Sequence, residues 1–222
     1  MKKKWNINNV NIEKKDTIEN PVIRKILYKR GITEEDEINR FLSPDIVNLH
    51  DPYLLKDMDK AVERIIRAID GDEKIIVYGD YDVDGITATT LLIYYFQNKF
   101  DKRIDFYLPD RINEGYGLNN EAIEYLNKKN YDLIITVDCG ITSFKEISLA
   151  KSKGIDVIIT DHHQPDKKLP EAHAVIDPYR EDDKYPFSNL AGVGVAFKLC
   201  QALEKEISGK LTTTFLYNQL DI

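Results

Sequence analysis

The sequence predicts an α/β fold, a parallel sheet flanked by helices and preceded by a mainly helical N-terminal segment. From Lys74 onward, short apolar runs rich in β-branched residues alternate with stretches long enough for helices. Strands and helices that alternate in this way indicate βαβ units, whose strands are parallel. Before Lys74 the apolar residues recur at helical spacing instead. We therefore divide the chain into an N-terminal helical segment, 1–70, and a sheet domain, 71–222.

The first 70 residues are expected to form helices. One contains Ile23, Ile26 and Leu27 and is ended by Gly31. A second would begin with Thr33 as its N-cap, followed by acidic residues. This second helix should turn three apolar residues toward a core: Ile38, Phe41 and Leu42. A third covers 57–69 with amphipathic spacing and is closed by Gly71.

The sheet domain should contain five strands with helices between and after them. The predicted strands are Ile75–Tyr78, Ile104–Leu108, Leu133–Val137, Val157–Thr160 and Ala174–Ile176. The predicted helices are Ile86–Asn98, Asn119–Lys129, Ser143–Lys153, Leu190–Ile207 and Thr212–Leu220.

Composition bounds the class of protein. The 222 residues are 42% hydrophobic and 31% charged, which suits a globular domain with a core. No run of about 18 apolar residues exists, and no apolar stretch follows the basic start, so neither a membrane span nor a secretory signal is expected. Two cysteines build no disulfide framework. We expect a cytoplasmic protein without a membrane partner.

The charge balance also excludes one class. A net charge of −7 and a pI near 5.2 argue against a protein that coats nucleic acid generally, because such proteins are usually basic. A nuclease is not excluded, since bound metal ions would neutralise many of the acidic residues and basic residues can cluster locally.

The turn after the first strand carries three carboxylates, at Asp80, Asp82 and Asp84. Alternate residues of an extended loop point the same way, so the three carboxylates should lie close together. Neighbouring negative charges repel and raise each other's pKa. A divalent cation removes this repulsion. A solvated acidic turn, or one aspartate that caps the next helix, is the alternative. Capping uses one carboxylate only, so we favour a metal site. A calcium-binding EF-hand is excluded, because its twelfth position would be Leu91 and a strand precedes the turn.

Further polar clusters follow later strands directly. Asp138 follows the third strand, and Asp161, His162 and His163 follow the fourth. In an open parallel sheet, sites form at the carboxyl ends of the strands, so these residues should meet the acidic turn in one crevice. Carboxylates with imidazoles suit manganese, and carboxylates alone suit magnesium. Two ions about 3.5–4 Å apart can hold phosphoryl oxygens, and Asp138 is the natural candidate to bridge them.

These clusters resemble three successive motifs of the DHH phosphoesterase superfamily: Asp80–Gly85, Val137–Gly140 and Asp161–His163. Within it, further stretches resemble the branch of bacterial single-strand-specific 5′→3′ DNA exonucleases. They are Pro109–Leu118, Leu190–Lys198, Phe41–Pro44 and Asp51–Leu54. The resemblance covers nearly the whole chain.

The resemblance implies a function and a ligand set. Two manganese ions, with magnesium as the alternative, would support hydrolysis of single-stranded DNA to 5′-mononucleotides in DNA repair and recombination. Asp82 and Asp84 would each bind one ion, Asp138 would bridge them and His162 would be a ligand. His163 would be a ligand or a contact to the scissile phosphate, and Asp80 a ligand or a catalytic neighbour. Single-stranded DNA is the implied partner, with single-strand-binding protein and a helicase as further candidates.

Three residues are candidates for substrate binding. Arg111 lies in the family-like loop after a strand, where a guanidinium matches a phosphate bidentately. Gly192 and Gly194 open a predicted helix and could approach a phosphate through backbone N–H groups. Close helix packing is the competing explanation for both glycines.

The chain departs from the family pattern at its end. In this branch the pattern continues into a strand that delivers one more metal-binding aspartate, and then into a C-terminal DNA-binding domain. We therefore expect 71–222 to be a truncated phosphoesterase domain, and 1–222 alone to bind metal weakly and cleave poorly. Two alternatives stay open: a DHH-family phosphoesterase that acts on oligoribonucleotides or dinucleotides, and a non-catalytic DNA-binding scaffold.

Overall fold

The computed structural model describes residues 18–43, 45 and 48–209. The chain divides into two compact units, Met1–Leu49 and His50–Ile222. The predicted helix Thr212–Leu220 lies outside the described residues. In the described part, no helix is both long enough and apolar enough to span a bilayer.

The first unit contains helices α1 (Pro21–Lys29) and α2 (Glu35–Leu42). The Asn20 side chain caps α1, and a small apolar cluster forms from Ile18, Leu27 and Ile38. Two details of the prediction for α2 are wrong. Its N-cap is Glu34 and not Thr33, and the apolar residues Phe41 and Leu42 are exposed. Ile38 is the residue of α2 that is buried.

The second unit begins with the short 3-10 helix η2 (Pro52–Leu54) and helix α3 (Met58–Asp70), which contacts strand β5 (Ala174–Ile176) and helix α7 (Gly192–Ser208). The buried Arg64 of α3 pairs with Asp156 at 2.6 Å and with Glu73 at 2.5 Å. Helix α3 thus packs with the sheet, whereas the sequence pattern grouped it with the N-terminal segment.

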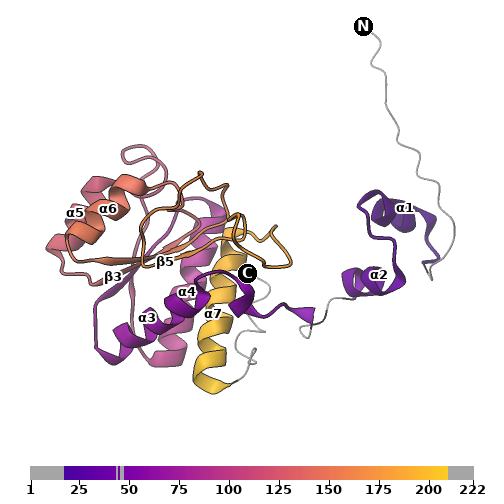
Figure 1. Cartoon of the computed structure of the whole chain (residues 1–222), viewed down its shortest axis with the longest axis horizontal. Helices are drawn as coiled ribbons and strands as arrows, with labels where there is room; N and C mark the ends of the chain where they lie inside the picture. Colours follow the sequence, from indigo (N-terminus) through magenta and orange to yellow (C-terminus); the bar gives the residue numbers. More distant parts are fainter. Residues whose placement is uncertain (1–17, 44, 46–47, 210–222) are drawn as a thin grey trace, which may run out of the picture. The chain divides into compact units, whose positions relative to one another are not determined.

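The sheet has five parallel strands in the order β2-β1-β3-β4-β5 (Figure 1). The other four strands are β1 (Ile75–Tyr78), β2 (Asp105–Tyr107), β3 (Leu133–Val137) and β4 (Asp156–Thr160). All five predicted strands are confirmed, and they are parallel as expected.

Helices cover both faces of this sheet (Figure 1). Helices α5 (Asn120–Lys128) and α6 (Phe144–Ser152) pack together on one face. On the other face, helix α7 packs against both α4 (Val83–Phe100) and α3. Crossovers between parallel strands are right-handed, so connections that run in opposite directions along the sheet place their helices on opposite faces. The four predicted helices of this region are confirmed, with ends shifted by up to three residues.

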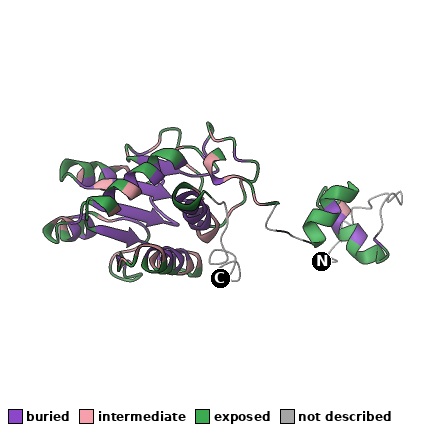
Figure 2. Cartoon of the chain, turned by 90° about the horizontal axis from the view of Figure 1, so that it is seen from below, coloured by how far each residue is buried: buried purple, intermediate pink, exposed green. Residues whose placement is uncertain are grey.

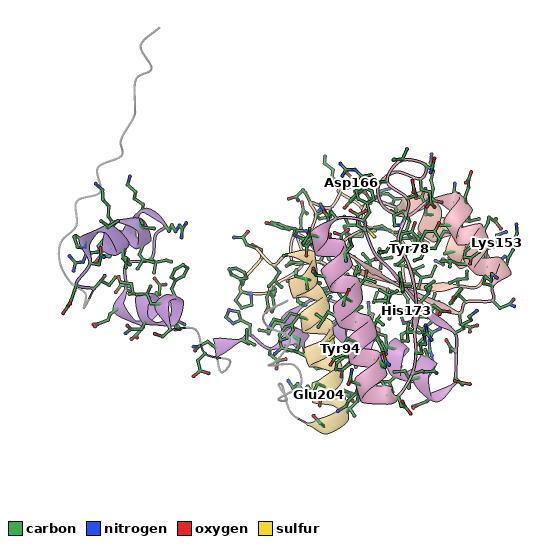
Figure 3. The ribbon with its side chains drawn as sticks, turned by 180° about the vertical axis from the view of Figure 1, so that it is seen from behind. Tyr78, Tyr94, Lys153, Asp166, His173 and Glu204 are labelled. Atoms are coloured by element: carbon green, nitrogen blue, oxygen red, sulfur yellow. The ribbon has the colours of Figure 1, made fainter. Side chains whose placement is uncertain are left out.

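The core lies between the sheet and these helices. Figure 2 shows that the central strands of the sheet are buried, and β1 and β3 are buried at every position. An apolar cluster joins Ile134 and Ile159 of the sheet to Ile123 and Leu126 of α5. On the other face, the buried Glu204 of α7 (labelled in Figure 3) accepts hydrogen bonds from two residues of α4, Lys99 at 2.8 Å and Tyr95 at 3.2 Å.

The strand order fixes where a site can form. The chain leaves β1 toward β2 on one side and returns to β3 on the other side of β1. Loops at the carboxyl ends of β1 and β3 therefore diverge, which opens a crevice at this switch point. All the predicted metal ligands are carried by the segments that follow β1, β3 and β4.

Candidate metal centre

The turn between β1 and α4 carries the first three aspartates. Asp82 is the N-cap of α4, and its Oδ1 accepts a hydrogen bond from the N–H of Gly85 at 2.9 Å. The turn is tight, because a Cβ on Gly85 would lie only 2.6 Å from the carbonyl oxygen of Asp80. Asp80 is buried, and its Oδ1 has no hydrogen-bond partner. Burial and the nearby Asp82 raise the pKa of Asp80.

Asp138 follows β3 in the left-handed backbone region, with a φ of 60°. Its side chain is buried, and its Oδ1 lies 3.0 Å from Nε2 of His162 without the geometry of a hydrogen bond. Burial, together with the carboxylates of Asp84 and Asp82, raises the pKa of Asp138 to about 8. Asp138 is therefore removed from water and lies close to other acidic side chains.

The two histidines after β4 are held by Asp161, for which sequence reasoning gave no separate role. Oδ1 of the buried Asp161 accepts from the backbone N–H of His162 at 2.7 Å and lies 2.7 Å from Nδ1 of His163. Its Oδ2 accepts from the N–H of Ile141 in the loop after β3 at 2.9 Å. Asp161 thus joins two loops and raises the pKa of His163 to about 9. Its position directly after a buried strand was the available sequence signal.

Tyr116 closes the side of the centre next to His163. Its hydroxyl donates to the carbonyl oxygen of Asp138 at 3.2 Å and lies 3.2 Å from Nδ1 of His163. Its ring meets that of Tyr81 edge to face, with centroids 6.5 Å apart. Arg111, which is exposed, lies with its guanidinium carbon 5.4 Å from the centroid of the Tyr81 ring. Sequence reasoning singled out Arg111 in this loop but missed Tyr116.

Two groups of candidate ligands share Asp138. One group is Asp80, Asp82 and Asp138, and the other is Asp138, His162 and His163. Within each group the ligand atoms lie within 4.8 Å of one another. Buried carboxylate oxygens without donors, as on Asp80 and Asp138, are unfavourable unless a cation compensates them. The residues present therefore fit divalent cations, and the mixed carboxylate and imidazole donors suit manganese.

Asp84 points to the same place but is held from another helix. Its two oxygens accept from the N–H groups of Gly192 and Val193 at the start of α7, each at 2.7 Å. Its Oδ2 also lies 3.5 Å from Nε2 of His162. A carboxylate has about four lone-pair sites, so these bonds leave room for a cation.

The structure gives the two glycines of α7 different surroundings. A Cβ on Gly192 would lie 2.4 Å from Oδ1 of Asp138, whereas one on Gly194 would meet the Leu190 side chain at 3.4 Å. Since the N–H of Gly192 already binds Asp84, the expectation that this group binds a phosphate conflicts with the structure. Close packing against the centre accounts for Gly192. A phosphate contact by Gly194 stays a prediction.

The fold and the site together define a parallel α/β domain with a candidate divalent-metal centre at its switch point. The chain belongs to the DHH family, because the profile described as "DHH family, N-terminal domain" matches residues 74–218.

Curated relatives extend the match beyond this domain. The single-stranded-DNA-specific exonuclease RecJ of Bacillus subtilis (strain 168) is 44% identical over 191 residues, which are 86% of this chain and 24% of that protein. The RecJ of Escherichia coli (strain K12) is 38% identical over 183 residues, or 82% of this chain and 31% of that protein. The chain thus spans about a quarter to a third of the length of these relatives.

Two solved structures share the fold. One is an exonuclease RecJ bound to manganese, 34% identical, with a TM-score of 0.64 over 69% of this chain and 39% of that one. The other is RecJ of Thermus thermophilus in complex with Mn²⁺, 30% identical, with a TM-score of 0.65 over 83% of this chain and 25% of that one.

Replacing Gly192 by alanine should disrupt the centre. The new Cβ would overlap the carboxylate of Asp138, so this side chain or the start of α7 must shift. We expect Gly192→Ala to weaken Mn²⁺ binding at least about tenfold, as changes that displace a metal ligand do. Gly194→Ala is the control, since its methyl group has room. Titration calorimetry with Mn²⁺ checks both, and equal affinities for the two variants would contradict the close packing.

The metal-free protein should lose stability as the pH rises. Asp138 has a folded pKa of about 8 against an ordinary value of 3.8, so the folded state binds more protons than the unfolded state between these values. The stabilisation that Asp138 contributes is fully present below about pH 4, which is roughly the ordinary carboxyl pKa. It is lost as the pH rises through about 8. Asp177, with a pKa raised by burial to about 7, and His163 act in the same direction.

Thermal denaturation between about pH 5 and pH 8, with a chelator present, measures this effect. Asp138→Asn should flatten the dependence of Tm on pH, and the exposed Asp166→Asn should leave it as in the wild type. An unchanged slope in Asp138→Asn would show that burial does not hold the proton on this carboxyl group.

Proposed function

We propose that this chain carries the metal centre of a single-stranded-DNA-specific 5′→3′ exonuclease, which hydrolyses phosphodiesters and releases 5′-mononucleotides in DNA repair and recombination. The observation that carries the proposal is the convergence of carboxylate and imidazole groups around Asp138, with two buried carboxylate oxygens that lack donors. The 44% identity to the B. subtilis RecJ exonuclease supports the choice of substrate.

The residues divide between two ions, manganese by preference and magnesium as the alternative. We assign Asp82 and Asp84 to one ion each and Asp138 to both, because Asp138 belongs to both ligand groups. His162 completes the set beside Asp138. Asp80 is a further candidate through its unpartnered Oδ1. When bound, such ions polarise the phosphoryl oxygens and lower the pKa of water.

His163 is suited to contact the scissile phosphate. In the metal-free protein its hydrogen bond to Asp161 raises its pKa to about 9, so there the imidazole is protonated at neutral pH and presents N–H donors. The ring is exposed, and Tyr116 fixes its other flank. Asp161 thereby orients His163 and holds its proton. A direct role of His163 as a metal ligand is the other assignment that the ligand group allows.

Single-stranded DNA is the proposed partner, and single-strand-binding protein and a helicase are the proteins we predict to act with it. Arg111 at the rim is the proposed phosphate contact. Its guanidinium lies over the Tyr81 ring, which leaves its edge for a phosphate.

The proposed activity is tested with the chain and Mn²⁺ on long single-stranded DNA labelled at either end, with a 5′-phosphorylated dinucleotide as the second substrate. We expect slow release of mononucleotides from the 5′ end, because this chain is expected to cleave poorly by itself, and a further loss of at least about 100-fold in rate in Asp138→Asn, since the shared carboxylate is removed. Asp166→Asn, on the loop after β4 (Figure 3), is the matched control that should keep the wild-type rate.

Other outcomes would move the assignment. Turnover of the dinucleotide alone would place the chain among phosphoesterases of small substrates. Mn²⁺ binding without hydrolysis of either substrate would favour a non-catalytic DNA-binding scaffold.

Arg111→Ala should raise the KM for single-stranded DNA about 10- to 100-fold, the equivalent of a charge-assisted hydrogen bond of about 1.5–3 kcal/mol. Arg111→Lys should recover part of the loss, because the charge stays but the bidentate geometry does not. The steady-state kinetics of both variants check this role, and a KM unchanged in Arg111→Ala would remove Arg111 from the substrate site.

A further inference from the structure

The backbone at Asp138 is left-handed, with a φ of 60°. This conformation costs an L-residue free energy, although aspartate tolerates it better than most residue types, so the surrounding contacts help to hold it. Gly140, two residues later, has a φ of 113°. The chain therefore reverses sharply just where the central carboxylate is presented, and something must hold that turn.

Hydrogen bonds from four directions fix this turn. The N–H of Asp138 donates to the carbonyl oxygen of Thr160 at 3.0 Å, and its own carbonyl oxygen accepts from Tyr116. The N–H of Ile141 donates to Asp161. The carbonyl oxygen of Cys139, at the apex, accepts from the side-chain hydroxyl of Thr136 at 2.8 Å.

Thr136 is placed for this contact by the strand. It is the last residue but one of β3, fully buried, and its hydroxyl reaches forward over the turn. The fit is close, because a Cβ on Gly140 would lie 2.9 Å from Thr136 Oγ1. Without the hydroxyl, the Cys139 carbonyl would lose this donor inside the protein, which is unfavourable. A methyl group in its place could not approach the oxygen to 2.8 Å, so the turn would have to move.

We propose that Thr136 is a positioning residue of the metal centre, whose hydroxyl holds Asp138 in the left-handed conformation and so aims its carboxylate at the shared ligand position. This inference rests on the proposed function, since it assumes that Asp138 binds metal. The hydroxyl of Thr136 bonds to the backbone of the turn, so Thr136 acts on Asp138 through the backbone.

The neighbouring strand supplies a matched control. Thr160 of β4 is equally buried, and its hydroxyl donates to the carbonyl oxygen of Thr136 at 2.7 Å. Its side chain makes this bond within the sheet rather than to the turn. Loss of the Thr160 hydroxyl removes a comparable buried hydrogen bond, whereas the backbone carbonyl of Thr160, which accepts from the N–H of Asp138, stays in place.

The experiment compares Thr136→Val, Thr136→Ala, Thr136→Ser and Thr160→Val in the full chain, with Mn²⁺ as the probe. Affinity is measured by electron paramagnetic resonance of free Mn²⁺, and Tm is measured separately. We expect Thr136→Val and Thr136→Ala to bind Mn²⁺ roughly tenfold more weakly, the loss typical of outer partners of a metal ligand. Thr136→Ser keeps the hydroxyl and should bind like the wild type, as should Thr160→Val.

The inference is overturned if Thr136→Ala binds Mn²⁺ like the wild type, or if Thr160→Val loses as much affinity. Thr136→Ala removes the hydroxyl without crowding Gly140, so its Mn²⁺ affinity can be measured even if Thr136→Val does not fold. If the wild type itself binds no Mn²⁺, the proposed function fails, and a crystal structure of Thr136→Ala decides the positioning role alone. A φ of Asp138 that leaves the left-handed region supports it, and a φ that stays there refutes it.

Discussion

The site depends on the burial of several carboxylates side by side at one edge of a sheet. Asp80, Asp138, Asp161 and Asp177 follow β1, β3, β4 and β5, and each is at most 1% exposed. Such a row repels itself and loses hydration, so each member needs donors or a cation. Asp161 is satisfied by N–H groups on both oxygens, whereas Asp80, Asp138 and Asp177 each keep an oxygen without a partner. The fully hydrogen-bonded Asp161 holds the loops together, and Asp80 and Asp138 belong to the candidate ligand groups.

Backbone donors connect this row to the helices that flank it. Asp84 in the first turn of α4 binds the first N–H groups of α7, so the starts of both helices meet at the same carboxylate. The N-terminus of a helix favours negative charge, which offsets part of the repulsion within the acidic cluster. Buried Glu204 joins the same two helices near the end of α7 through Lys99 and Tyr95. The α4–α7 pair is therefore joined by a partly buried carboxylate at one end and a buried one at the other.

Local sequence was sufficient for most of the architecture. The five strands of the sheet and the four helices α4 to α7 were predicted because apolar periodicity and β-branched runs report burial directly. The convergence of residues near 80, 138 and 161 followed from one rule about the carboxyl ends of parallel strands. Helix ends were less accurate: α4 begins at Val83, because Asp82 turns its side chain back to cap the helix.

The period of each element and the placement of acids and histidines directly after strands thus follow from the sequence alone, since both depend on near neighbours. Contacts between distant segments were decided by the tertiary structure. The N–H of Gly192 binds Asp84, 108 residues away, and a side chain at Gly192 would strike Asp138. Asp161 orients His163 and also ties the loop of Ile141, and α3 packs with the sheet through Arg64. Such pairings carry no periodic signal, because they arise only when packing brings the two segments together.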